Sequence, residues 1–115
     1  MARQHLNGVF KDFEKLVVTK LAGPHRGPEK LAAVLAEAEF VSEEHCDIGY
    51  DLTVRHPALP VEREVSNYPI LSGIIDGVAC GFIVFLMDGE LTIECHSWAA
   101  ADIPPDVRER GLQIE

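Results

Sequence analysis

Residues 94–98, Glu-Cys-His-Ser-Trp, place a carboxylate, a thiol, an imidazole, a hydroxyl and an indole in one unbroken row. Such groups could form a catalytic Cys–His pair or a metal site if their side chains met on one side of the chain. Successive side chains of a β-strand point to opposite faces, so the local secondary structure decides whether they meet.

The surrounding sequence predicts a β-hairpin. Residues 80–87 and 90–98 are strand-like, and they flank Asp88-Gly89, the commonest signature of a two-residue type I′ turn. The turn sets the register of the two strands. One face then pairs Leu86 with Leu91, Val84 with Ile93, Phe82 with Cys95 and Cys80 with Ser97, while the other pairs Met87 with Glu90, Phe85 with Thr92, Ile83 with Glu94 and Gly81 with His96.

The two faces of this hairpin separate the residues of the row. The first face is nearly all apolar, so we expect it to form the core, with Cys95 buried in it as a small hydrophobe. Glu94, His96 and Trp98 then point away. Cys95 and His96 therefore cannot form a catalytic pair, and we predict no catalytic residue here.

The second face supplies the candidate binding residues Phe85, Glu94, His96 and Trp98. It is too apolar for a solvated surface and too polar for a core, so something should cover it. We expect that cover to be the loop at residues 55–69 or the C-terminal tail of the same chain. A second copy of the chain or a protein partner is the alternative, because interfaces favour Trp, Phe and Met.

A metal site is not expected from the sequence. The three cysteines (Cys46, Cys80 and Cys95) show none of the paired spacings of zinc sites. Glu94 and His96 could supply two ligands from one strand face. A third ligand would have to come from His45, His56 or Asp51, and nothing in the sequence brings these residues together. We therefore predict no metal and no cofactor.

The elements that must position these residues follow from periodicity and turn signals. Apolar residues at helical spacing predict helices over residues 7–23, with Asn7 as N-cap, and 28–39. Alternating patterns predict strands at 40–46, 47–56 and 70–77 before the hairpin, with a long loop between that holds a short edge segment at 61–65. A short strand at 112–114 ends the chain. The prediction is a single α+β domain over 1–115, with two N-terminal helices packed on one face of an antiparallel β-sheet.

Charge and composition restrict the partners. The net charge is −9, and residues 40–115 carry fourteen acidic but only four basic side chains. This balance disfavours nucleic acid and suits a basic protein partner. No apolar run approaches about 18 residues and the N-terminus lacks the apolar stretch of a signal peptide, so we expect no membrane association and a cytoplasmic location. An odd cysteine count fits that reducing compartment.

Four stretches resemble a group of small, uncharacterised bacterial α+β proteins. They are "FEKLVVTKLAG", "LAAVLAEAEFVSEEHCDIGYDLTV", "GFIVFLMDGELTIECHSW" and a Pro-containing tail. Glu94 matches the glutamate of that group, while residues 95–98 and Ile103-Pro104 depart from its pattern. By analogy of fold and charge, the resemblance implies proteins like the immunity proteins that neutralise toxins.

Three functions are consistent with the sequence. The first is a non-enzymatic protein-interaction domain, immunity-like in character, that binds a basic partner. The second is a small-ligand-binding or metal-dependent enzyme that uses Glu94 and His96. The third is a structural homodimer with Trp98 and Phe85 across a two-fold axis. We expect the first, because no motif for catalysis or phosphate binding is present.

Overall fold

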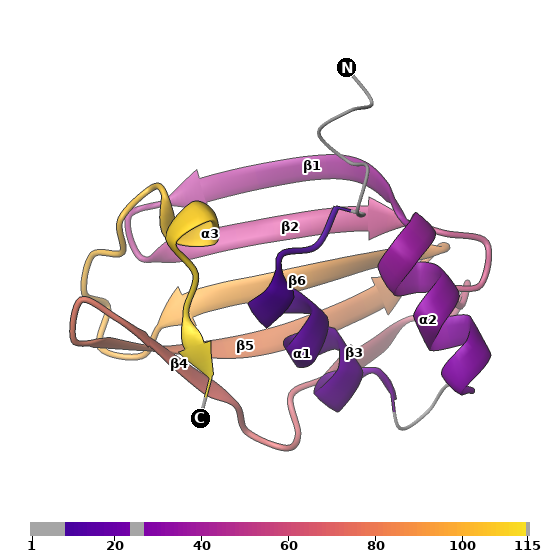
Figure 1. Cartoon of the computed structure of the whole chain (residues 1–115), viewed down its shortest axis with the longest axis horizontal. Coiled ribbons are helices and arrows are strands. Elements are labelled where there is room, and N and C mark those ends of the chain that lie inside the picture. The colour runs from indigo at the N-terminus through magenta and orange to yellow at the C-terminus, as the bar shows by residue number, and fades with distance from the viewer. Residues whose placement is uncertain (1–8, 24–26, 115) are drawn as a thin grey trace.

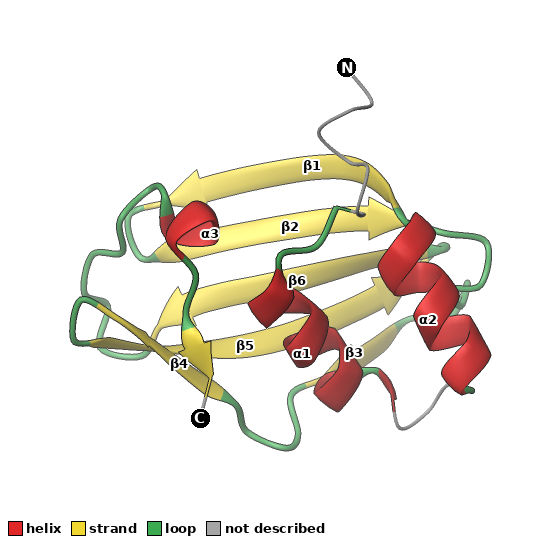
Figure 2. Ribbon diagram, in the orientation of Figure 1, coloured by secondary structure: helices red, strands yellow, loops and turns green. Residues whose placement is uncertain are grey.

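The computed structural model describes residues 9–23 and 27–114, and its fold is α+β (Figures 1 and 2). The elements in chain order are α1 (Asp12–Leu21), α2 (Pro28–Glu37), β1 (Glu39–Cys46), β2 (Gly49–Arg55), β3 (Glu64–Ser66), β4 (Ser72–Ile75), β5 (Val78–Met87), β6 (Glu90–Ser97), α3 (Val107–Arg110) and β7 (Gln113–Ile114). In this part of the chain, no helix has the length and apolarity to cross a membrane.

The seven strands form one open antiparallel sheet. Their order is β1-β2-β6-β5-β4-β7, and β3 pairs with β5 on the same side of that strand as β4. In the described part of the chain, the three helices lie over one face of the sheet, with α1 across its middle, α2 over one end and α3 near β1 and β2 at the other end (Figure 1). The predicted arrangement of two N-terminal helices on one face of an antiparallel sheet is therefore confirmed.

The β5–β6 hairpin has the predicted register throughout. Every predicted pair is present, from Met87 opposite Glu90 to Cys80 opposite Ser97. The turn residues Asp88 and Gly89 have φ angles of 55° and 76°, the left-handed conformation that a type I′ turn requires. The turn chemistry alone was sufficient to set the pairing of both strands.

The first helix begins later than predicted. Residues 9–11 are not helical, and α1 starts at Asp12, while Asn7 lies outside the described residues. The Lys11 backbone N–H donates to Oε1 of Glu14 at 2.8 Å, and this hydrogen bond fixes the first turn. Val9 and Phe10 precede the helix and are buried. Their apolar side chains belong to the core, and their match to the helical spacing did not indicate a helix.

The segments beyond the hairpin differ in detail from the prediction. The edge segment expected at 61–65 is β3 at Glu64–Ser66, which pairs with residues 84–86 of β5. The expected final strand is β7, at Gln113–Ile114. The short helix α3 was not predicted, because four residues after two prolines give too little periodicity to recognise.

The core lies between the helices and one face of the sheet. Val17 and Val18 of α1 are fully buried against an inner face that includes Leu52, Val84 and Ile93. The chain measures 36 × 34 × 21 Å, as expected for one layer of helices on one sheet. Among the described residues, no helix lies over the opposite face of the sheet (Figure 1).

Candidate functional site

The four predicted binding residues lie on the face of the sheet turned away from the helices, here called the outer face. Phe85 comes from β5, Glu94 and His96 come from β6, and Trp98 follows directly after β6. The Trp98 backbone N–H donates to the carbonyl of Ala79 at 3.1 Å, which extends the ladder beyond Ser97. Their common face confirms the alternation inferred for residues 94–98.

The expectation that the same chain covers this face is wrong. The 55–69 loop forms β3 beside β5 and extends the sheet instead of crossing it. The tail packs on the helix side, where Val107 and Leu112 are buried in the core. Trp98 is therefore 59% exposed and Met87 is 50% exposed. The loop satisfies backbone hydrogen bonds at the edge of β5, and the tail buries its apolar side chains in the core.

Glu94 and His96 have a third neighbour on the outer face, Asp51 of β2. Asp51 lies directly opposite Glu94 in the β2–β6 pairing. His96 Nε2 is 3.5 Å from Asp51 Oδ1, and His96 Nδ1 is 3.7 Å from Glu94 Oε1. One ligand atom from each residue lies within 4.8 Å of the other two. The structure thus brings Asp51 to the pair, while His45 and His56 bind elsewhere, to Glu43 and Glu37.

Glycines flank His96 on both neighbouring strands. Gly49 of β2 and Gly81 of β5 are its direct partners across the sheet. A Cβ at Gly49 would lie 2.6 Å from His96 Cδ2, and a Cβ at Gly81 would lie 2.0 Å from Trp98 Nε1. The missing side chains let the imidazole lie over β2 and the indole over β5, so both rings lie flat against the sheet.

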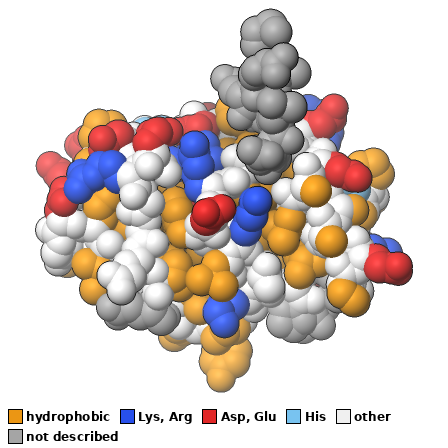
Figure 3. All heavy atoms as spheres, in the orientation of Figure 1, with side chains coloured by type: hydrophobic (Ala, Val, Ile, Leu, Met, Phe, Trp, Pro, Cys, Tyr) orange, Lys and Arg blue, Asp and Glu red, His pale blue; other side chains and the backbone are white. Residues whose placement is uncertain are grey.

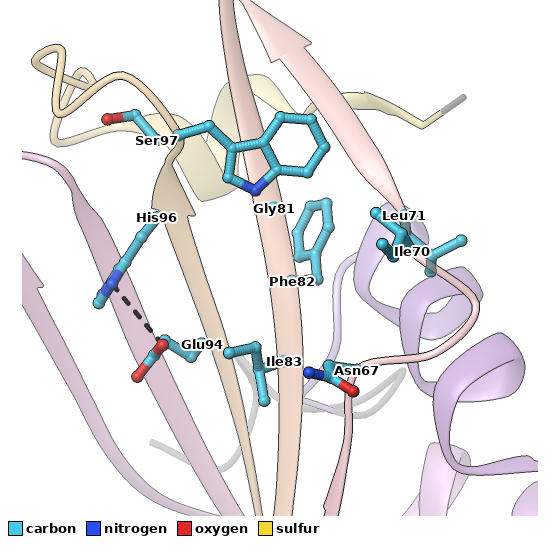
Figure 4. Close-up of a pocket in the computed structure, with 10 residues that line it drawn as sticks. Asn67, Ile70, Leu71, Gly81, Phe82, Ile83, Glu94, His96 and Ser97 are labelled. Atoms are coloured by element: carbon cyan, nitrogen blue, oxygen red, sulfur yellow. Dashed lines mark ion pairs between the residues drawn. The ribbon is translucent and has the colours of Figure 1, made fainter.

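A shallow cavity of about 270 Å³ lies beside these rings (Figure 4). Glu94 and His96 stand on its β6 side and point toward each other, while Ile70 and Leu71 close its far side. Ile83 and Trp98 complete the apolar wall. The cavity is slightly smaller than the usual range for small-molecule sites, about 300–1,000 Å³, and suits a single inserted side chain better.

Cys95 has the buried position that the hairpin predicted. It is fully buried beside Cys80, and a hydrogen bond with Cys80 together with burial raises its pKa above the usual thiol value. Its thiol points into the core, away from His96, so the row at 94–98 is not a catalytic pair.

We expect one thiol to react in the folded protein and three in the unfolded protein. Cys46 is exposed, while Cys80 and Cys95 are buried, and only an accessible thiolate reacts quickly. Labelling with a thiol reagent, counted by mass spectrometry in buffer and in denaturant, checks this. Fast native labelling of Cys95 would contradict the hairpin geometry, and Cys46→Ser is the control that should abolish native labelling.

A second polar cluster lies under the helices, and the sequence reasoning missed it. The fully buried Glu14 accepts hydrogen bonds from Tyr50 Oη at 2.5 Å and from Arg108 Nε at 2.7 Å and Nη2 at 2.8 Å. Arg108 also donates to Glu43 at 2.7 Å and to the Val9 carbonyl at 2.9 Å. This Glu14–Arg108 network joins α1, β1, β2 and α3.

The electrostatics of the network favour the charged forms of Arg108 and Glu43 and the neutral form of Tyr50. Burial opposes ionisation of Arg108, but the adjoining carboxylates of Glu14 and Glu43 hold its pKa above the ordinary value. Burial likewise raises the pKa of Glu43, but hydrogen bonds from His45 and Arg108 outweigh it and hold that pKa below its usual range. Burial and the Glu14 carboxylate raise the pKa of Tyr50.

The Glu14–Arg108 network is a structural feature. The only buried side-chain polar atom without a hydrogen bond, in the described part of the chain, is Oδ1 of Asp51, which lies on the outer face. The network therefore has no unsatisfied buried group to offer a ligand, whereas the outer face does. This difference makes the outer face the candidate site.

Comparison of the chain with protein-family models, with curated proteins and with solved structures found no match. The functional assignment therefore depends on the site itself.

Asp51 was one of three possible third ligands named from the sequence, and the sequence contained one signal that favoured it. Gly49 and Asp51 fall on one face of the predicted 47–56 strand, and a glycine inside a strand marks a close approach of another group. What the pattern lacked was the strand order. Asp51 meets Glu94 only because β2 pairs with β6, more than forty residues along the chain.

Proposed function

We propose that this chain is a non-enzymatic protein-interaction domain that binds a basic protein through the outer face of its sheet. The observation that carries the proposal is the open outer face, on which partly or largely exposed apolar side chains adjoin a row of carboxylates. The immunity-like role, in which an acidic protein neutralises a toxin, is the form of this function that we propose.

The apolar half of the outer face has the composition of an interface core. Aromatic residues and methionine are favoured in such cores, and exposed apolar patches of this kind mark interaction sites. Full burial of each large apolar side chain would contribute about 1.5–3 kcal/mol. This half consists of Val65, Ile70, Ile83, Phe85, Met87 and Trp98.

The other half of the outer face determines the charge of the partner. Glu44, Asp51 and Glu94 form a continuous row across β1, β2 and β6, and Glu90 lies opposite Arg55 farther along the sheet. Acidic side chains also gather along the β1 edge in the view of the helix side (Figure 3). A second copy of the chain would carry the same excess of carboxylates, so charge favours a basic partner over self-association.

The same features support a cytoplasmic location and argue against nucleic acid as a partner. Three cysteines without disulfides suit a cytoplasmic interaction, and the acidic surface disfavours nucleic acid. An enzyme that uses Glu94 and His96 is the second candidate, supported by the position of Asp51 beside them. The shallow cavity argues for the interaction domain, because a substrate would remain largely in water.

The predicted role of the outer face can be tested with two matched variants. Trp98 and Leu16 are both exposed apolar residues, 59% and 41%, but Leu16 lies on α1 at the helix side. A partner is identified by capture on the immobilised protein at physiological salt and is then purified for titration. Trp98→Ala should weaken its binding by at least about thirtyfold, as for an interface anchor, while Leu16→Ala should change it less than threefold.

Tryptophan fluorescence and sedimentation show whether a protein partner or a second copy of the chain binds to the outer face. Trp98 is the only tryptophan, so the fluorescence of the protein reports on it alone. In the isolated monomer its emission maximum should be close to that of indole in water, and iodide should quench it. Binding of the partner should shift the maximum to shorter wavelength. Equal effects of the two variants, or binding that does not weaken with salt, would overturn the proposal. A dimer that Trp98→Ala dissociates would assign the face to a second copy instead.

A further inference from the structure

We propose that Asp51, Glu94 and His96 form a binding site for a divalent transition-metal ion, with Zn²⁺ as the best match. This inference is independent of the proposed protein partner, because it concerns the isolated chain.

The three ligand atoms are spaced for one ion. Since they lie within 4.8 Å of one another, some point lies within about 2.8 Å of all three. Bonds from zinc to imidazole nitrogen and carboxylate oxygen measure about 2.0–2.2 Å, so each ligand atom has to move by less than about 1 Å. The 3.5 Å between His96 Nε2 and Asp51 Oδ1 exceeds a charge-assisted hydrogen bond, about 2.7–2.9 Å. It is close to the roughly 3.4 Å between two ligands of a tetrahedral ion with such bonds.

The charges around the site favour a bound cation. Glu44, Asp51 and Glu94 stand directly opposite one another on three neighbouring strands, and like charges in that position destabilise a sheet. Oδ1 of Asp51 is in addition buried without a hydrogen bond, although the Asp51 side chain as a whole is 39% exposed. A buried acceptor without a partner is unfavourable, and more so when it is charged. A metal ion would satisfy Oδ1 and offset the repulsion at once.

The backbone holds the imidazole in place for this role. Gly49 has no side chain, so the His96 ring lies across β2 toward Asp51, and a Cβ there would lie 2.6 Å from His96 Cδ2. Glu94 and His96 share one face of β6 with one residue between them, which keeps both side chains on the same side. Rigid strands thus supply all three ligands.

The ligand set indicates the class of ion. One imidazole nitrogen and two carboxylate oxygens suit Zn²⁺ and related transition metals, whereas Ca²⁺ and Mg²⁺ prefer oxygen ligands alone. Three protein ligands leave at least one coordination position open. The sequence predicted no metal because nothing in it brings His45, His56 or Asp51 to Glu94 and His96, and the β2–β6 pairing brings Asp51 there.

The test uses Zn²⁺ alone as the probe. Chelator-treated protein is titrated by calorimetry, and we expect one ion per chain at this site. Asp51→Asn, Glu94→Gln and His96→Gln should each weaken Zn²⁺ binding by at least about tenfold, since even outer-shell changes weaken metal sites by that much. Glu44→Gln is the matched control: it removes one charge from the same row but no ligand, and should weaken binding less than threefold.

A second measurement keeps folding separate from binding. Amide resonances of the wild type should shift on Zn²⁺ addition at residues 49–51 and 94–96, and each variant should keep its circular dichroism spectrum. If the wild type shows no binding, or if His96→Gln binds as well as the wild type, the site does not exist. If Glu44→Gln weakens binding as much as the ligand variants do, the acidic face attracts cations only diffusely, and the proposal is overturned.

Discussion

Glu14→Gln should lower the free energy of unfolding by about 3–5 kcal/mol, the cost of removing one partner from a buried ion pair. The change leaves the Arg108 guanidinium, 5% exposed, with only the partly exposed Glu43 as counter-charge. It also weakens the hydrogen bond that Tyr50 donates. Urea denaturation followed by circular dichroism measures the loss.

Two further variants show whether the buried charge is the cause. The double variant Glu14→Gln/Arg108→Met removes both charges, and it should recover part of the stability that the single variant loses. Asp76→Asn breaks the exposed ion pair with Arg110 and should leave the denaturation midpoint near that of the wild type. Asparagine also tolerates the positive φ angle at this position. A Glu14→Gln variant as stable as the wild type would show that the network contributes little.

Gly49→Ala should destabilise the protein by about 3 kcal/mol or more, at the upper end of the cost of overpacking. The added Cβ would lie 1.8 Å from the carbonyl oxygen of Cys95. Because that atom belongs to the backbone of β6, the strain can be relieved only if β2 and β6 move apart. The pairing that brings Asp51 to Glu94 would be disturbed by the same movement. Thermal or urea unfolding measures the change.

Gly81→Ala is the matched comparison, since Gly81 flanks His96 on the other side. The three atoms nearest to its added Cβ all belong to the indole of Trp98, a side chain that is 59% exposed and can shift more easily than a backbone atom. We expect a loss of about 1 kcal/mol or less, with a change in tryptophan fluorescence. Equal losses for the two variants would mean that β2 and β6 do not approach as closely as the structure shows.

The sequence predicts best what short-range chemistry determines. The Asp88-Gly89 turn determined the register of sixteen residues, and alternation then placed Phe85, Glu94, His96 and Trp98 on one face. The helices were recognised because their apolar residues repeat at helical spacing, although burial of Val9 and Phe10 made the first helix look longer than it is.

The features that the sequence did not predict all depend on contacts between distant segments. Asp51 joins His96 through the pairing of β2 with β6, and Glu14 meets Arg108 from the other end of the fold. A charged residue in an amphipathic helix is usually solvent-exposed, so nothing local marks Glu14 as buried. The sequence did not predict that the outer face is uncovered. Whether a segment such as the 55–69 loop covers the face of a sheet or pairs with its edge depends on contacts across the whole fold.

The ion pair between Glu14 and Arg108 also affects how the chain can fold during its synthesis. Its two partners are 94 residues apart in sequence, and synthesis proceeds at about 5–20 residues per second. For several seconds, therefore, α1 exists with a carboxylate on the face that will enter the core and with no cation to neutralise it. Burying this carboxylate without its cation is unfavourable, so we expect α1 to dock stably on the sheet only after α3 has emerged. The order of synthesis would then delay burial of the first helix until α3 is available.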